Sequence, residues 1–254
     1  MKTVFRIFSL LFMSLLAFSS SCGANSQSES SSEMSDSTTS AASQKCTHVD
    51  KRGGLVIYTP EYSKVDLVCG TMPSIGDENV LFCAEGAFTS QFLNHFEHSN
   101  VGGMHVSGGK FYKGTKMGRN SGAFVYYNGT YRFFHQGNIE AEMHKAEKAG
   151  GMGFCQEMMI HKGKRVKTHR PDKNRNEFRA LCSLGGKLCV IDTNGVAAFG
   201  DFINMLLKEG VEEALYLDMG PGWNYSWWRD SSGEAHKIHD TPTSYATNWV
   251  TFYK

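Results

Sequence analysis

The sequence predicts an α+β fold: a mixed, largely antiparallel twisted sheet with a C-terminal strand-helix-strand unit and flanking helices. Composition indicates it first, because aromatic residues reach 12% and glycine (27 residues) far outnumbers proline (5), as is typical of short strands joined by tight turns. Two hairpin signals, Asn128-Gly129 and Gly185-Gly186, indicate antiparallel pairing. A helical apolar pattern also lies between two short apolar runs near the C-terminus.

Size and charge limit the function classes. The 254 residues suffice for one large domain or two small ones, and 41% hydrophobic against 20% charged residues is normal for a protein with a folded core. With 26 basic and 25 acidic residues the formal charge is +1, so no basic excess exists to neutralise many phosphates. We therefore expect no nucleic-acid partner.

Residues 1–21 have the layout of a bacterial export signal. Lys2 and Arg6 precede an apolar run over residues 8–18, which is too short to cross a bilayer as a helix. Small residues then lead directly into Cys22, as in a lipobox, although Ser19 stands where leucine is usual. We expect cleavage before Cys22 and lipidation of this residue, with simple secretion as the alternative. The expected location is the bacterial cell envelope, anchored in the membrane and facing the periplasm or the cell surface.

Residues 22–45 form a serine-rich stretch without aliphatic periodicity. Such a segment cannot bury enough apolar surface to offset its ordering entropy, so we expect a flexible tether between the lipid and the domain. Residues 46–254 then make up the folded domain.

Short strands and one helix are predicted in the first half of this domain. Apolar runs indicate strands at Leu55–Thr59, Val65–Cys69 and Val80–Ala84. Asn128-Gly129 supplies the two positive-φ residues of a type I′ turn, and so predicts a hairpin of Ala123–Tyr127 with Thr130–Phe134. Ile139–Lys148 is rich in helix formers and precedes a pair of glycines, which predicts a helix.

A second hairpin is predicted over Leu181–Asp192, turning on Gly185-Gly186. A two-residue loop places Cys182 opposite Cys189, where the Cβ atoms are close enough for a disulfide, and export implies an oxidising compartment. The alternative is a pair of small core thiols. No pairing can be derived for the remaining cysteines of the domain: Cys46, Cys69, Cys83 and Cys155.

The segment from Lys187 to Gly222 is the most informative for function. A strand ends near Asp192, an amphipathic helix ends at Gly210, and a second strand ends at Asp218. This order most simply makes a right-handed parallel unit, which puts Asp192 and Asp218 at one end of the sheet. Ligands bind outside the carboxyl ends of such strands. The apolar face of the helix consists of Phe202, Ile203, Leu206 and Leu207.

Several blocks resemble the phosphodiester glycosidase family, which includes the enzyme that removes N-acetylglucosamine from a phosphodiester and many bacterial proteins. Ala214–Gly220 (ALYLDMG), after the Asp201–Ile203 segment, is similar to the family signature. Further blocks follow in the family's order: Cys83–Phe88, Val101–Lys110, Gly122–Gly129 and Arg179. The resemblance spans about residues 53–254. The sequence departs from the family at Ala84-Glu85, where asparagine is common, at Met219, where glycine is usual, and at Trp223-Asn224, where a serine often occurs.

The resemblance implies hydrolysis of a glycosyl phosphodiester or a related glycoconjugate, with a carbohydrate or glycosyl phosphate as substrate. Cleavage of a glycosidic bond generally takes two carboxylates, and Asp218 and Glu85, each at a strand end, are the expected acid/base pair. Arg179 is the expected phosphate clamp, because a guanidinium grips two oxygens at once. The alternatives are turn or cap roles for the carboxylates and a surface ion pair for the arginine. Other cations near it in sequence are Arg170, Lys173 and Arg175.

Six residues are expected to bind substrate: His105, Gln156, Asn194, Gly220, Trp223 and Trp228. The histidine suits proton donation or phosphate binding and the two amides suit sugar hydroxyls, with structural roles as the alternative. Gly220 lies in a loop where the backbone can approach a ligand closely. Trp223, Tyr225 and Trp227 share one face of an extended segment, with Trp228 on the other. Their flat rings suit a sugar or, alternatively, the core.

No cofactor is expected, because no metal-ligand set has a recognised spacing. Two histidine pairs, His95/His98 and His236/His239, would share a helix face but lack further ligands; a divalent ion on Asp218 is left open. Two rival functions remain. One is a non-catalytic, glycan-binding surface lipoprotein, and the other is a structural or assembly lipoprotein with a degenerate site.

Overall fold

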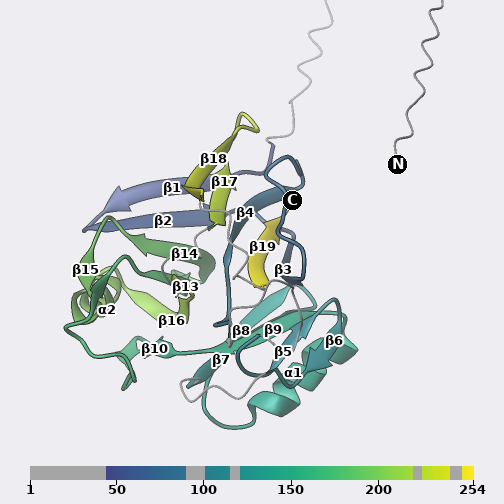
Figure 1. Ribbon diagram of the computed structural model, residues 1–254, viewed down its shortest axis with the longest axis horizontal. Coiled ribbons are helices and arrows are strands. Elements are labelled where there is room, and N and C mark those ends of the chain that lie inside the picture. Colours follow the sequence, from purple (N-terminus) through teal and green to yellow (C-terminus); the bar gives the residue numbers. More distant parts are fainter. Residues whose placement is uncertain (1–43, 90–100, 115–120, 220–224, 241–247) are drawn as a thin grey trace, which may run out of the picture. The chain divides into compact units, whose positions relative to one another are not determined.

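Three larger antiparallel sheets make up most of the computed structural model (Figure 1). The structure describes residues 44–89, 101–114, 121–219, 225–240 and 248–254, all of which belong to one compact unit, residues 42–254. The predicted export signal and Cys22 lie outside these ranges.

The first sheet has seven strands in the order β1-β2-β14-β13-β16-β10-β11, and its paired neighbours are antiparallel. Its strands are β1 (Thr47–Arg52), β2 (Leu55–Pro60), β10 (Met158–His161), β11 (Lys164–Arg165), β13 (Arg179–Leu184), β14 (Lys187–Thr193) and β16 (Val211–Leu217). The first half of the chain therefore supplies only the β1–β2 edge of this sheet.

The second sheet has five strands in the order β18-β17-β4-β19-β3, and the third has five in the order β6-β5-β9-β7-β8. The second contains β3 (Lys64–Cys69), β4 (Val80–Glu85), β17 (Tyr225–Arg229), β18 (Ala235–Asp240) and β19 (Asn248–Tyr253). The third contains β5 (His105–Ser107), β6 (Lys110–Tyr112), β7 (Gly122–Tyr127), β8 (Thr130–His135) and β9 (Met152–Gln156). A separate small pair consists of β12 (Arg175–Asn176) and β15 (Ala197–Ala198).

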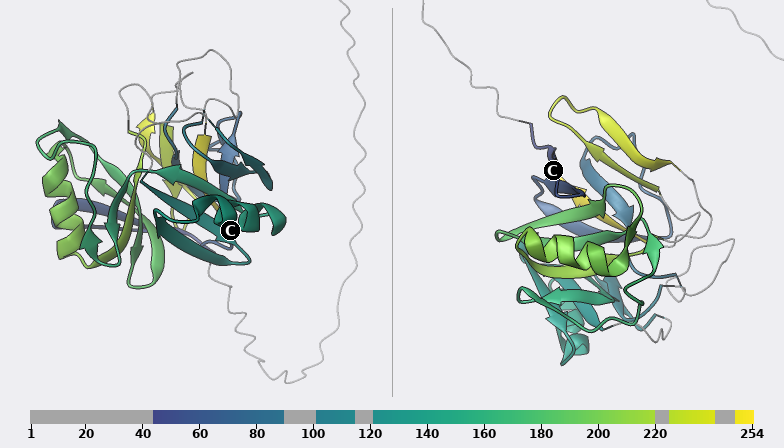
Figure 2. Two further views of the ribbon diagram at one scale, coloured as in Figure 1. Left: turned by 90° about the horizontal axis from the view of Figure 1, so that it is seen from below. Right: turned by 90° about the vertical axis from the view of Figure 1, so that its left-hand side faces the viewer.

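Two helices occur in the described part of the chain, and each covers the outer face of a different sheet (Figure 1 and Figure 2). α1 (Ile139–Lys148) packs Met143 and Ala146 against the third sheet. α2 (Phe199–Lys208) packs its buried face, including Phe202 and Leu206, against the seven-stranded sheet. Neither helix is long and apolar enough to cross a membrane.

The predicted α+β class is wrong, because the fold is mostly β. Strands take up 53% of the described residues and helices 11%, which leaves too little helix for a balanced class. The reason lies in the many short apolar segments between turn glycines. They pair into three sheets rather than one, and only the two segments with true helical periodicity form helices.

The predicted strand-helix-strand unit is present in modified form as β14, α2 and β16. β14 and β16 run in the same direction but are not neighbours, since β13 lies between them and is antiparallel to both. Asp192 and Asp218 therefore do lie at the same end of the sheet, as predicted. Gly210, with φ of +86°, follows the helix where its end was expected.

Both predicted hairpins are confirmed. Asn128 and Gly129 have φ of 52° and 70° and join β7 to β8, with Tyr127 paired to Thr130. Gly185-Gly186 joins β13 to β14 and sets Cys182 directly opposite Cys189. In the structure these two cysteines are free thiols, and the Cys189 Sγ donates to the carbonyl oxygen of Cys182 at 3.7 Å.

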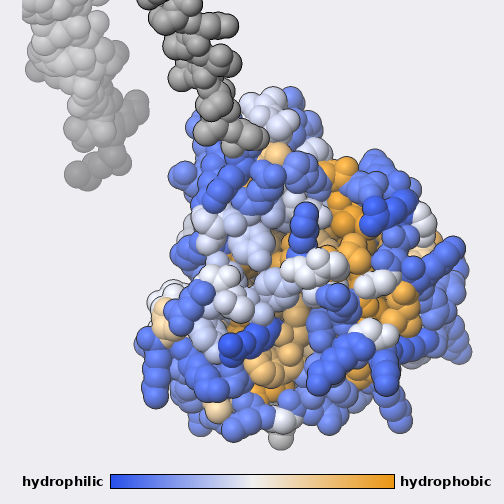
Figure 3. Space-filling view, turned by 180° about the vertical axis from the view of Figure 1, so that it is seen from behind, coloured by the Kyte–Doolittle hydropathy of each residue, from blue (hydrophilic) through white to orange (hydrophobic). Residues whose placement is uncertain are grey.

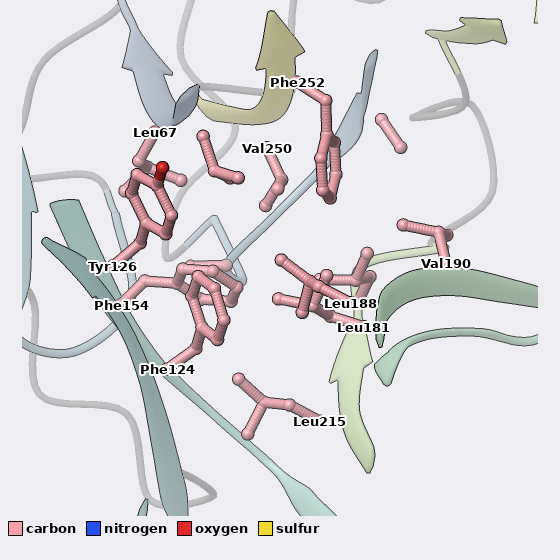
Figure 4. Close-up of a cluster of buried hydrophobic side chains, with 14 of the residues drawn as sticks. Leu67, Phe124, Tyr126, Phe154, Leu181, Leu188, Val190, Leu215, Val250 and Phe252 are labelled. Carbon is pink, nitrogen blue, oxygen red and sulfur yellow. The ribbon is translucent and has the colours of Figure 1, made fainter. Parts of the chain in front are cut away.

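One apolar core is shared by all three sheets (Figure 4). Phe252 and Val250 reach it from the second sheet, Phe124 from the third, and Leu181 and Leu215 from the first. Each fully buried side chain of this size contributes about 1.5–3 kcal/mol. Seen from behind, hydrophilic side chains cover much of the surface, and hydrophobic atoms are visible in the gaps between them (Figure 3).

Replacing Leu215 by alanine is expected to lower the free energy of unfolding by about 2–5 kcal/mol, because it leaves a cavity where the sheets meet. Urea unfolding followed by tryptophan fluorescence measures this loss. The control is Val196→Ala: Val196 is 61% exposed, so its truncation should change stability by no more than about 0.5 kcal/mol. Equal losses in the two variants would contradict a shared core.

Candidate active site

The ends of β4 and β16 are joined by their main chains, although they belong to different sheets. The Asp218 amide donates to the Gly86 carbonyl at 3.0 Å. Gly86 itself has no room for a side chain, since a Cβ there would lie 2.8 Å from the Asn248 Oδ1. That Oδ1 accepts from the Ala87 amide at 2.7 Å. These hydrogen bonds hold the end of β4, and with it Glu85, beside Asp218.

A buried ion pair occupies the neighbouring end of β13 and β14. Arg179 and Asp192 are directly opposed in register. The guanidinium Nε and Nη2 each donate to one oxygen of the Asp192 carboxylate at 2.7 Å. Arg179 is completely buried and Asp192 is 5% exposed. Two of the three guanidinium nitrogens of Arg179 thus already donate to Asp192, so the predicted grip on a phosphate by two nitrogens of Arg179 is not possible in this arrangement.

The third nitrogen of this guanidinium faces Glu85. The Arg179 Nη1 lies 3.8 Å from the Glu85 Oε2, and neither atom has a hydrogen-bond partner within the described residues. The other oxygen, Oε1, accepts from the Tyr225 amide. The structure thus brings Glu85 and Arg179 together, places Asp218 next to them through its main-chain bond to Gly86, and adds Asp192 as a fourth member. We refer to these four residues as the carboxylate–arginine cluster.

Burial raises the pKa of Glu85 to about 8. Removal of the charged form from water is the largest cause; Arg179 lowers the pKa, and the negative Asp218 raises it further. Asp192 already neutralises Arg179, so Glu85 gains less from that cation than an isolated pair would. A carboxylic acid that keeps its proton near neutral pH is suited to general acid catalysis.

A hollow of about 220 Å³ adjoins the cluster. Asp192, Met219, Tyr58 and His239 line it, together with Lys51. Burial, and then the nearby Arg179, lower the pKa of His239, so its imidazole is neutral at pH 7. The hollow therefore offers a ligand one exposed ammonium group and a neutral imidazole beside two carboxylates, the buried Asp192 and the half-buried Glu177.

The predicted substrate-binding residues are scattered. Asn194 lines the hollow and is exposed. His105 is fully buried, with its ring stacked on Tyr112 at 5.1 Å and its Nδ1 3.2 Å from the Gly103 carbonyl oxygen. Gln156 is also fully buried, and its Oε1 accepts from the Glu157 amide at 2.8 Å. Of the four described residues among these six, only Asn194 lines the hollow; Gly220 and Trp223 lie outside the described residues.

The aromatic segment mostly faces the core. Tyr225 and Trp227 are 9% and 0% exposed and belong to an apolar cluster with Trp249. Trp228, on the other face, is half-buried and stacks on His236 with ring centroids 4.4 Å apart. Trp228 also packs against the core cluster and lies 6.5 Å from Tyr58, between ring centroids.

The sequence analysis missed two features of the site: the pairing of Arg179 with Asp192, and the presence of Tyr58 and His239 in the hollow. Counting the Gly185-Gly186 hairpin back from its turn puts Arg179 opposite Asp192, so their pairing was derivable from the sequence. Tyr58 and His239 had no such signal, because they reach the hollow from strands whose pairing spans much of the chain. Arg170, an alternative phosphate ligand, instead lies over the Tyr216 ring at 4.7 Å.

Two side-chain groups in the described residues have metal-ligand chemistry: Cys46, His48 and Glu61, and Asp230, Glu234 and His236. Neither includes a member of the carboxylate–arginine cluster. His236 and His239 lie on strand β18, so the helical spacing considered for them does not apply.

The pH dependence of stability is expected to show the titration of Glu85. Its folded-state pKa of about 8 exceeds the unfolded value, so the stability it contributes is complete below about pH 4 and is lost as the pH rises through 8. Relative to Glu85→Gln, the wild type should lose up to about 1.4 kcal/mol per pH unit between roughly pH 5 and 8. Urea unfolding at several pH values measures the difference. The exposed control Glu140→Gln should follow the wild type, and a pH-independent gap for Glu85→Gln would refute the raised pKa.

Comparison with known proteins identifies a solved structure with a similar fold. No protein-family model matches the sequence, and no curated protein matches it. Among solved structures, the chain is similar to the auto-inhibited catalytic domain of zebrafish N-acetylglucosamine-1-phosphodiester α-N-acetylglucosaminidase, with 12% identity, a TM-score of 0.55 and 85% of each chain covered. At this identity the likeness shows the fold and not the activity. The chain thus shares its fold with the catalytic domain of a phosphodiester glycosidase.

Proposed function

We propose that this protein is a hydrolase that cleaves a glycosyl phosphodiester or a related glycoconjugate by carboxylate acid/base catalysis. The observation that carries the proposal is the meeting of Glu85, Arg179 and Asp218 at joined strand ends. The named substrate of the zebrafish protein, an N-acetylglucosamine-1-phosphodiester, supports a substrate of this class.

Glu85 and Asp218 take complementary roles in the proposed reaction. Protonated Glu85 donates its proton to the oxygen that leaves the anomeric carbon, as the bond between them breaks. Ionised Asp218 accepts a proton from the water that attacks the same carbon. The products are a free sugar and the released phosphomonoester or alcohol. The raised pKa of Glu85 supports its assignment as the acid of the pair.

Arg179 is proposed to act mainly through charge. Its bidentate bond to Asp192 leaves only Nη1 to face a substrate oxygen or Glu85. A phosphoryl group therefore needs a further cation, and Lys51, which lines the adjoining hollow, is proposed to supply it.

The proposal extends to export and lipid anchoring at Cys22, with the domain in the bacterial cell envelope. This part is supported by the sequence of residues 1–22. The rival, a glycan-binding protein without activity, is weakened because Tyr225 and Trp227 are buried in an apolar cluster.

Asp218→Asn and Glu85→Gln are each expected to lower kcat at least 100-fold on a panel of sugar-1-phosphodiesters, because each removes one proton-transfer group. Release of free sugar from the purified protein measures turnover. The control is Asp201→Asn, an exposed carboxylate on α2, which should leave kcat unchanged.

Three outcomes would decide against the proposal. Unchanged hydrolysis by Asp218→Asn would remove the acid/base pair, and an equal loss in Asp201→Asn would show that stability and not chemistry is measured. Binding of the glycans by the wild type without turnover would favour the rival.

A further inference from the structure

Three side chains with metal-ligand chemistry meet at the open end of the β1–β2 hairpin. Cys46 precedes β1, His48 is the second residue of β1, and Glu61 follows β2. The pairing of Thr47 with Pro60 makes Cys46 and Glu61 the next facing pair, and the Glu61 amide donates to the Cys46 carbonyl at 2.8 Å. Because residues two apart on a strand point to one face, Cys46 and His48 lie on the same side as the glutamate.

The reactive atoms of these side chains lie close together. The Cys46 Sγ is 3.9 Å from the His48 Nε2 and 4.0 Å from the Glu61 Oε2, while the His48 Nε2 is 2.8 Å from the Glu61 Oε1. A tetrahedral zinc ion with ordinary bond lengths holds such ligand atoms about 3.3–3.7 Å apart. Small side-chain rotations, without backbone movement, would bring these atoms to that spacing.

We propose that Cys46, His48 and Glu61 bind a Zn²⁺ ion. A thiolate, an imidazole and a carboxylate are the three ligand types that zinc takes, whereas magnesium and calcium take oxygen ligands. The Cys46 thiol loses its proton to solvent as the zinc–sulfur bond forms. This site is separate from the carboxylate–arginine cluster, and the proposal does not depend on the proposed hydrolase activity.

The surroundings suit a three-ligand site with one open position. Cys46 is 5% exposed, whereas the side chains of His48 and Glu61 are 64% and 44% exposed, so an ion would be reached from their side. A hollow of about 300 Å³ lies there, lined by both residues and by Tyr62 and Lys187. Water or a small anion from this hollow can complete the tetrahedron, as in sites with three protein ligands.

The second group, Asp230, Glu234 and His236, fits a metal less well. Its Asp230 Oδ1 already accepts from the Ser232 amide, the Ser232 hydroxyl and the Glu234 amide, and Oδ2 pairs with the His236 Nε2 at 2.7 Å. These bonds shape the β17–β18 turn. The tip of that turn lies beside the start of the described chain (Figure 1 and Figure 2), so the experiment has to separate the two groups.

The test is titration of the purified, metal-free full chain with Co²⁺ and with Zn²⁺ against a chromophoric chelator. We expect one equivalent of tightly held metal and a near-ultraviolet thiolate-to-cobalt charge-transfer band. Cys46→Ser should abolish the band and weaken zinc binding at least tenfold, and His48→Ala should weaken binding at least tenfold. Zinc should also raise the Tm of the wild type but not that of Cys46→Ser.

Matched variants make the test specific. His161→Ala removes a histidine that pairs with Glu213 at 2.8 Å and belongs to neither group of metal-ligand side chains, and it should bind zinc like the wild type. Cys22→Ser should keep the cobalt band, because Cys22 is not one of the proposed ligands. The absence of a band in the wild type, its persistence in Cys46→Ser, or loss of binding only in His236→Ala would each overturn the proposal.

Discussion

A buried guanidinium between two carboxylates organises one end of this fold. Arg179 gives two hydrogen bonds to Asp192 within the first sheet, and its remaining nitrogen faces Glu85 of the second. Removing one partner of a buried ion pair typically costs about 3–5 kcal/mol, because the other charge is left uncompensated. The arginine therefore acts between sheets that also share apolar contacts, the main-chain bond from Asp218 to Gly86 and a hydrogen bond from the Thr47 hydroxyl to the Leu81 carbonyl.

The same arrangement explains why Glu85 differs from its neighbours. The Arg179 guanidinium interacts with more than one carboxyl group, and its geometry is better with Asp192 than with Glu85. Glu85 is therefore left buried, near the negative Asp218 and without a committed counterion, so protonation is the cheapest way to balance the charge. The acid that the proposed reaction needs is thus a consequence of how the two sheets are joined.

Local features were predictable because the residues that fix them are close in sequence. The Asn128-Gly129 and Gly185-Gly186 hairpins and the helix over Ile139–Lys148 each depend on a dozen residues or fewer. The fold class was not predictable in this way. Strand pairs such as β19 with β4, in which Trp249 is opposite Glu85, join segments far apart in sequence, and no local pattern specifies such partners. The site residues were selected from the order of the family-like blocks in the sequence. The pairing of Arg179 with Asp192 could have been predicted by counting residue pairs outward from the Gly185-Gly186 turn.

Charge balance also constrains what the site can bind. Asp192, Asp218 and Glu85 supply three carboxyl groups against the single guanidinium of Arg179, and Glu85, with a pKa of about 8, relieves part of this excess by keeping its proton near neutral pH. A phosphodiester anion placed directly over this cluster would be repelled, and the low local dielectric would strengthen the repulsion. For the proposed substrate, the phosphoryl group would instead need the adjoining hollow, where Lys51 offers a positive charge but Glu177 and Asp192 are also present. If the proposed substrate binds here, its phosphate is therefore expected nearer to Lys51 than to the carboxylate–arginine cluster.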